Sequence, residues 1–420
     1  GAVLPGDQSF RAPTMYKLHP STIALGLFLY AIYFVLVPDC GHVYDNQCWS
    51  DWAAYYLEKG FRHSYESGTN YFPGHLYQLK LFSLFFDSKE DLAAHIYQLK
   101  RITLLGDLVG AFLLASCARV RWQQHALLLV LLLNPAFLHN TLVWGQFDTV
   151  FSALVFGSFI FLHKRRYLLS AISYLLALNF KFQAILFLPA MVLLFVYASG
   201  LKPDWRKILR GLAILVAMQL VILAPFIVSK SMGRLWEVVD SLGGRYSYLS
   251  LYADNFWYLS MSGNLRLTGD FNTWMGLNYK TWGLIMTAAT LLLVFFPLLL
   301  VLYKRWKGQM VTYDLEDAAG LLGLSVLAFF FFSTQMHERY TFPAFYFIAF
   351  IALQSRWWWL FGVFSMAYLL NNERALPHFL NGVPTILSSP PAVAVLYLIV
   401  LVSVLVRLWM PKKSAVRTGF

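Results

Sequence analysis

Charged residues are scarce in this chain. Asp, Glu, Lys and Arg together make up 13% of its 420 residues, whereas hydrophobic residues make up 59% and aromatic residues 18%. A soluble domain of this length needs a far larger charged surface. The composition therefore excludes a soluble protein and indicates one that lies in a membrane.

The chain also lacks the short motifs of metal and nucleotide sites. Its 3 cysteines do not have the paired spacing of a zinc site, and it contains no phosphate-binding glycine loop and no low-complexity tract. Cys40 and Cys48 share one loop, where they can form a disulfide in an oxidising compartment or remain thiols, and Cys117 lies in an apolar run. We expect no cofactor and no bound metal.

Long apolar runs fill the sequence instead, at the length of about 17 to 25 residues that crosses a bilayer as a helix. Candidate spans lie near 22–37, 102–118, 126–143, 149–162, 209–228, 282–303, 318–333, 342–353, 358–370 and 393–408. The run 168–198 is interrupted at 179–183 and is interpreted as two short helices, which gives about twelve crossings. The pattern predicts an all-α polytopic membrane protein.

Basic residues are distributed unevenly around these runs. The formal net charge is +12, but the basic side chains occupy short turns and form no single soluble face, so we expect no nucleic-acid partner. Those on one side are Arg119, Arg121, Lys164, Arg165, Arg166, Lys202, Arg206, Lys207, Arg210, Lys304, Arg305, Lys307, Arg356, Arg407, Lys412 and Lys413. The positive-inside rule makes that side, and both termini, cytoplasmic. The longer connections 38–99, 229–280 and 371–392 then face the extracytoplasmic side.

The domain organisation is simple. Residues 1–14 precede Met15, which can serve as the natural start, and are expected to be a vector-derived remnant or a disordered leader. Residues 15–420 are expected to form one integral membrane domain whose chemistry lies in the outer loops 38–99 and 229–280.

The first outer loop contains two carboxylates near an amphipathic stretch. The apolar residues of 49–60 have helical spacing and predict a helix in the membrane interface. Asp45 lies just before it, where it can cap the helix or serve a site. Asp51 lies within it, where a solvated position is the simpler interpretation.

Four further polar clusters fall on the same side. Gln146 and Asp148 lie at a turn in "HNTLVWGQFDTVF", and Lys181 interrupts the hairpin in "LNFKFQ". Arg245 and Asn255 belong to "GRYSYLSLYADNFWYL". The last cluster, His337, Glu338 and Arg339, ends the apolar run in "FFFFSTQMHERYTF". Each cluster alone fits helix capping or interface anchoring, but five on one face of a chain this poor in polar groups indicate a site.

The residue types indicate what such a site handles. Cations and imidazoles at the membrane boundary suit a lipid-linked phosphate, and carboxylates and amides beside aromatic rings suit a sugar. Transfer of a sugar from a polyprenyl phosphate needs one carboxylate base and a few cations, because the phosphate leaving group requires no general acid. No metal is required.

The order of these motifs resembles that of the GT-C glycosyltransferases of membranes. It is most similar to the dolichyl-phosphate-glucose glucosyltransferases of N-glycan assembly and to prokaryotic relatives of the second mannosyltransferase of GPI anchors. The matching elements are Asp45 followed by Trp52, "WGQFD", "LNFKFQ", "RYSYLSLYADNFW" and "QMHERYTFP". "NYFPGHLY" stands where those families have a Tyr-Pro-Pro segment, so Phe72 and Gly74 depart from the pattern on the acceptor side.

The resemblance implies roles for individual residues. It makes Asp45 the catalytic base, with Asp51 as its competitor, and it makes Glu338 the residue that orients His337 or Arg339. The residues expected to hold the donor phosphate are His337, Arg339, Lys181 and Arg245. The residues expected to line the sugar or acceptor pocket are Gln146, Asp148, Asp51, Glu338, Asn255, Trp257 and Tyr71.

The expected activity is inverting, metal-independent transfer of a hexose, mannose before glucose, from a polyprenyl- or dolichyl-phosphate sugar to a lipid-linked or glycan acceptor. A prokaryotic plasma membrane is favoured over the endoplasmic reticulum. The alternative is a transporter or lipid flippase, which also has embedded Asp, Lys and His residues. Against it, the two halves of the chain do not correspond, and the polar clusters lie at one face.

Overall fold

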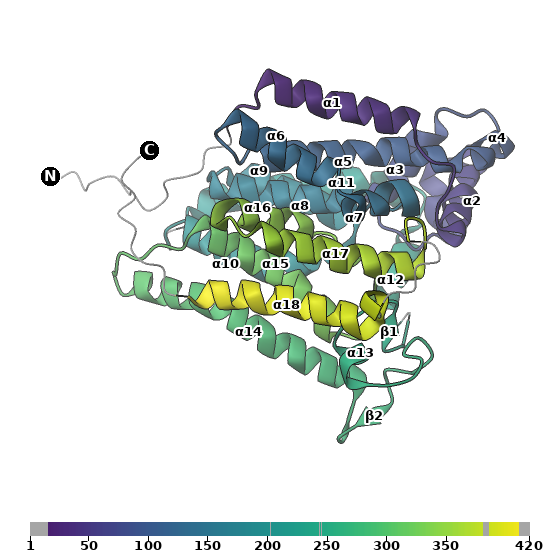
Figure 1. The fold of residues 1–420 in the computed structure, drawn as a ribbon. Coiled ribbons are helices and arrows are strands. Elements are labelled where there is room, and N and C mark those ends of the chain that lie inside the picture. Colours follow the sequence, from purple (N-terminus) through teal and green to yellow (C-terminus); the bar gives the residue numbers. More distant parts are fainter. Residues whose placement is uncertain (1–15, 202, 243, 245, 381–385, 411–420) are drawn as a thin grey trace.

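The computed structural model describes residues 16–201, 203–242, 244, 246–380 and 386–410, so the predicted leader 1–14 lies outside the described residues. Most helices run side by side in one bundle (Figure 1). The bundle helices are α1 (Pro20–Val35), α5 (Lys100–Ala115), α6 (Arg121–Leu132), α8 (Asp148–His163), α9 (Tyr167–Phe180), α10 (Leu188–Ala198), α11 (Trp205–Val228), α14 (Tyr279–Trp306), α15 (Leu315–Phe332), α16 (Ala344–Ser355), α17 (Trp358–Ala375) and α18 (Pro390–Trp409). Each coincides with one of the predicted apolar runs.

Four of these helices, α11, α14, α15 and α18, are long and apolar enough to cross a membrane. A fifth candidate is α6 with its continuation through α7 (Pro135–Leu138) and the π-helix η3 (His139–Trp144), bent by 50°. The other apolar helices are shorter, including α1, α8, α9 and α16. The total of about twelve crossings stays a prediction.

Burial separates the helices into a core and a lipid-facing layer. α16 is buried along almost its whole length and packs on α15 and α17, while α8 packs on α5 and α9. α11 and α14 instead expose Leu, Val and Ile side chains along most of their lengths. Because lipid tails are as apolar as these side chains, such a surface is stable only within a bilayer.

The outer loops gather at one end of the bundle (Figure 1). They contain α2 (Val43–Lys59), η1 (Phe61–Ser67), α3 (Pro73–Ser83), α4 (Lys89–Ala94), η2 (Ile96–Leu99), α12 (Met232–Ser241), α13 (Phe256–Ser260), β1 (Ser250–Leu251), the hairpin of β2 (Thr273–Trp274) and β3 (Leu277–Asn278), β4 (Met336–His337) and η5 (Ile386–Ser388). A parallel pair of β1 and β4 joins the loop before α14 to the segment after α15.

Two differences from the predicted helix bounds affect the outer end of the bundle. α2 begins at Val43 instead of Trp49, because the N–H of His42 bonds the carbonyl of Trp144 at 3.1 Å and its imidazole caps the first turn. α17 continues past Leu370 to Ala375, because its polar last turn has partners. In that turn Arg374 pairs with Asp254, and Asn371 donates to the carbonyl of Tyr252.

The broken hairpin is as predicted. α9 ends at Phe180, Lys181 is extended, and η4 (Phe182–Phe187) leads into α10. Within the part of the chain that the structure describes, none of the three cysteines is in a disulfide, so the alternative of a Cys40–Cys48 bridge is not realised.

Gly74 lets α3 pack closely on the end of α9, at the position where this chain departs from the Pro-Pro pattern. A Cβ at residue 74 would lie 2.8 Å from the carbonyl oxygen of Asn179 and from the Phe180 ring. A main-chain oxygen cannot yield as a flexible side chain can.

We therefore expect Gly74→Ala to destabilise the protein by about 1 to 3 kcal/mol through overpacking. Gly211→Ala on α11 is the matched control, because a Cβ there meets nothing within 4 Å. Thermal unfolding in detergent measures both variants. Equal melting temperatures for the two would contradict the close approach.

Candidate active site

Asp45 lies in the first turn of α2 and points toward the turn that follows η3. Its Oδ2 accepts hydrogen bonds from Trp144 Nε1 at 2.9 Å and from Gln146 Nε2 at 2.7 Å. His42 is the residue that caps α2, and its Nδ1 lies 3.5 Å from the same oxygen. Since the Asp45 carboxylate bonds side chains from another segment, it does not cap its own helix.

The environment of Asp45 keeps it ionised. Burial raises the pKa of its carboxyl, but the neighbouring imidazole of His42 and the positive charge of Arg339 outweigh burial and hold the pKa well below its usual range. Asp45 is therefore an anion at neutral pH.

The π-helix η3 brings Trp144 and Gln146 to Asp45. Gly145 ends it with φ +91°, a left-handed conformation that favours glycine. The N–H groups of Gly145 and Gln146 both donate to the carbonyl of Asn140, at 3.1 and 2.9 Å. Single π-turns are frequent at functional sites. In this one, the side chains of Trp144 and Gln146 both donate to Asp45 Oδ2.

Lys100 fixes the segments on either side of this contact. Its side chain is buried, and its ammonium donates to the carbonyls of Pro38 at 3.1 Å, Cys40 at 2.7 Å and Leu142 at 2.6 Å. His42 also stacks on Trp144, with 5.0 Å between the ring centroids. One buried cation thus ties the chain entering α2 to the chain entering the η3 turn.

Asp148, in the first turn of α8, is paired on both oxygens. Lys181 bonds Oδ1, while Oδ2 accepts a 3.1 Å hydrogen bond from Asn140 Nδ2 and lies 3.6 Å from Arg339 Nε. Its side chain is buried. Asp148 is therefore a fixed partner of two cations and is not available as a base.

Arg339 joins these groups. Its Nη1 donates to Glu338 Oε1 at 2.6 Å, and its guanidinium lies over the Trp144 ring, 5.0 Å from the centroid. Its buried Nε makes no hydrogen bond among the described residues. The guanidinium therefore keeps a donor that is not used.

Glu338 is in contact with both of its neighbours. Its Oε2 lies 3.8 Å from His337 Nδ1. Burial raises the Glu338 pKa, but Arg339 and His337 together bring it to about 2. Burial lowers the pKa of His337, whose main chain is held by the β1–β4 pair, so its imidazole is neutral at pH 7.

The structure thus brings together seven residues predicted from the sequence, namely Asp45, Gln146, Asp148, Lys181, His337, Glu338 and Arg339. Tyr71 lies beside them, packed between Trp52, His75 and Phe147. We call this set of eight residues the outer cluster. Arg245 lies outside the described residues.

Three predicted residues do not join the outer cluster. Asn255 Nδ2 donates to the carbonyl of Phe330 at 3.0 Å, and Trp257 Nε1 donates to that of Phe332 at 3.1 Å, so both anchor α13 to the end of α15. Asp51 is exposed and accepts a 2.8 Å bond from Gln47. Sugar contacts by these three residues stay predictions.

Four residues of this region, Lys100, His42, Trp144 and Asn140, were not predicted from the sequence to belong to the site. The only signal for Lys100 was a lysine at the start of a candidate span. The other three matter through contacts between distant segments, which a single sequence does not reveal. Among the described residues, no group of three or more His, Cys, Asp and Glu is placed to hold a metal ion.

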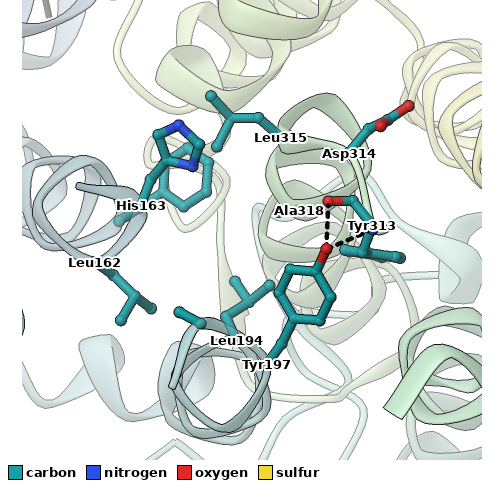
Figure 2. A pocket seen from close by; sticks show the side chains of 10 residues that line it. Leu162, His163, Leu194, Tyr197, Tyr313, Asp314, Leu315 and Ala318 are labelled. Atoms are coloured by element: carbon teal, nitrogen blue, oxygen red, sulfur yellow. Dashed lines mark hydrogen bonds between the residues drawn. The ribbon is translucent and has the colours of Figure 1, made fainter. Parts of the chain in front are cut away.

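A small apolar cavity of about 20 Å³ lies at the other end of α8 and α15 (Figure 2). Leu162, Leu194 and Leu315 line it, and Tyr197 bonds the main chain of Tyr313 at its wall. Its volume is close to that of one water molecule. It is too small for a substrate.

The role of Lys100 predicts a stability effect. Lys100→Met should leave three partly buried carbonyls without this donor, at about 1 to 3 kcal/mol for each that finds no water. The melting temperature should fall, whereas Lys59→Met, at an exposed position on α2, should leave it unchanged. An unaltered melting temperature for Lys100→Met would rule out the anchoring role.

Comparison with known proteins agrees with the geometry. The model of the ALG6, ALG8 glycosyltransferase family matches residues 98–388, which include Gln146, Asp148, Lys181 and the His337–Arg339 segment but not Asp45. No individually curated protein gives a significant match. The chain therefore belongs to the ALG6, ALG8 glycosyltransferase family, of the GT-C type that uses dolichyl-phosphate sugars, and is a membrane glycosyltransferase.

Proposed function

We propose that this enzyme transfers a hexose, mannose before glucose, from a polyprenyl- or dolichyl-phosphate sugar to an acceptor hydroxyl, with inversion and without a metal. Asp45 is the general base, and Arg339 is the main cation for the donor phosphate. The reaction takes place at the extracytoplasmic face of a prokaryotic plasma membrane or in the lumen of the endoplasmic reticulum. The termini lie in the cytoplasm.

The observation that carries this proposal is the arrangement around Trp144. Asp45 bonds the edge of the indole at Nε1, and Arg339 lies over its face. An ionised carboxylate and a guanidinium with an unused donor are thus held by one rigid ring. This is the minimal apparatus for deprotonating a hydroxyl beside a phosphate.

The bonds change as follows. The acceptor hydroxyl gives its proton to Asp45, and its oxygen attacks the anomeric carbon on the face opposite the phosphate. The bond between the anomeric carbon and the phosphate oxygen breaks, and its electron pair leaves with the polyprenyl phosphate. One substitution from the opposite face inverts the anomeric configuration.

Charge accounting supports the assignment of Arg339. The donor phosphate is a diester with one negative charge and leaves as a monoester with a second one developing. The Arg339 guanidinium interacts more strongly with the developing dianion than with the bound donor, which lowers the barrier. Asp45 becomes neutral as it takes the proton, so the net charge of the site and its ligands does not change.

The positions of the basic residues support the proposed sidedness. α8 begins at Asp148 in the outer cluster and is followed by the basic turn Lys164–Arg166, and the last turn of α14 contains Lys304 and Arg305. The outer cluster and the basic turns therefore lie at opposite ends of the helices, as the positive-inside rule requires of an extracytoplasmic site. The transporter alternative finds no support in the family assignment.

Asp45→Asn tests the base. We expect hydrolysis and transfer of radiolabelled sugar from synthetic polyprenyl-phosphate-mannose or -glucose, with EDTA present, to fall by about 100- to 10,000-fold. Asp240→Asn, an exposed change on α12, is the control. Full activity in Asp45→Asn would move the base to another carboxylate, and dependence on added metal would contradict the mechanism.

Arg339→Gln tests the coupling between cation and base. Without the guanidinium, donor kcat/KM should fall by about 100-fold. Burial of Asp45 is then opposed by less positive charge, so its pKa rises and activity is lost at a higher pH on the acid side. kcat/KM measured across the acid range for wild type, Arg339→Gln and Arg339→Lys checks this. An acid limb that does not move in Arg339→Gln would separate Arg339 from Asp45.

A further inference from the structure

A cavity of about 560 Å³ opens on the outer side of α2, within the size range of sites that bind small ligands. The walls are one face of α2, the segment 39–41 that precedes α2, and α4 with the residues after it. α2 and α4 lie together at the outer end of the bundle (Figure 1). None of the eight residues of the outer cluster lines this cavity, whereas Asp51, which the sequence analysis expected to bind sugar or acceptor, does line it.

The chemistry of the walls suits a polyol. Carboxylates from Asp39, Asp51 and Glu90 and the amides of Asn46 and Gln47 line the cavity. Carboxylate oxygens accept hydrogen bonds from hydroxyls, and amides both donate and accept. Tyr97 adds an aromatic ring of the kind against which a sugar face packs.

The charge of the walls selects against anions. Three carboxylates face one lysine, Lys89, whose ammonium is already paired with Glu58 at 2.8 Å. The negative charges of these carboxylates repel a negatively charged ligand such as a phosphate or a uronic acid. The cavity therefore suits a neutral saccharide and not the phosphate end of either lipid.

The cavity adjoins the base through Asn46. This residue follows Asp45 in the chain and lines the cavity. The Oδ1 atom of Asn46 would lie 3.7 Å from a Cβ placed at Gly145. The next residue in the chain, Gln146, donates a hydrogen bond to Asp45. Asp45 itself does not line the cavity, so the cavity holds the part of a ligand that lies behind the reacting group.

We propose that this cavity is a subsite for the neutral sugar rings of the acceptor that are remote from the reacting hydroxyl. The inference rests on the proposed function, since it gives Asp45 a glycan acceptor. Binding energy from remote rings positions the reacting hydroxyl at Asp45. Filling the cavity should therefore impair transfer to a glycan and leave hydrolysis of the donor by water intact.

The test uses the full-length enzyme with a radiolabelled polyprenyl-phosphate hexose and three probe acceptors, namely an octyl monosaccharide, an octyl disaccharide and an octyl glucuronide. Ala93→Trp, at an exposed position on α4, and Ala54→Trp on α2 fill the cavity from two sides. Lys59→Trp adds the same side chain to α2 away from the cavity.

We expect both filling variants to raise the KM for the octyl disaccharide at least tenfold, with donor hydrolysis within twofold of wild type. Lys59→Trp should match wild type. Asp51→Asn, a change of equal size, should also raise the disaccharide KM. Wild type should use the neutral disaccharide and reject the glucuronide.

Unchanged disaccharide KM values in both filling variants would overturn the subsite, as would equal use of the glucuronide. Failure of wild type to use either neutral glycoside while it hydrolyses the donor in an Asp45-dependent way would also overturn it and leave the proposed function standing. If the enzyme hydrolysed neither the mannose nor the glucose donor, the proposed function would fail first and the subsite with it.

Discussion

The structure of the outer end of the bundle depends on the contacts that the guanidinium of Arg339 makes. The guanidinium contacts Glu338, approaches Asp148 to 3.6 Å and lies over Trp144. A buried ion costs several kcal/mol unless it is paired. The turn after η3, the start of α8 and the segment after β4 must therefore stay together.

The ion pairs around Arg339 and Asp148 also explain the positions of the neighbouring charged side chains. Asp148 neutralises Lys181 at the break between α9 and η4, which allows a lysine to remain at the end of an apolar helix. Lys181 also lies over the Tyr340 ring, 5.0 Å from its centroid. Asp45 is left with hydrogen bonds from neutral donors and the field of Arg339, so it alone among these carboxylates can take up a proton from a ligand without breaking an ion pair.

Much of this arrangement could be predicted from the sequence, because the signals are local. The helix positions follow from apolar runs, and the break at 179–183 follows from a lysine in such a run. Asp45, Gln146, Asp148, Lys181 and Arg339 were predicted because polar residues are conspicuous in so apolar a chain.

The start of α2 was predicted six residues too late, because its cap depends on Trp144, which is about a hundred residues away. The π-helix, the buried Lys100 and the polar last turn of α17 depend on contacts of the same kind. Asn255 and Trp257 were predicted from a local motif to bind sugar or acceptor. In the structure their side chains donate hydrogen bonds to main-chain carbonyls at the end of α15.

The anchoring of Lys100 has a consequence for the biosynthesis of the enzyme. The carbonyls that it binds belong to residues 38, 40 and 142, and the side chains that bond Asp45 belong to residues 144 and 146, so all of these groups are present once the first 146 residues have been synthesised. Arg339 is synthesised almost two hundred residues later, after most of the helices. The nascent chain therefore contains the side chains that bond Asp45 long before it contains the guanidinium of Arg339, so the charge network of the outer cluster is among the last sets of contacts that the growing chain can form.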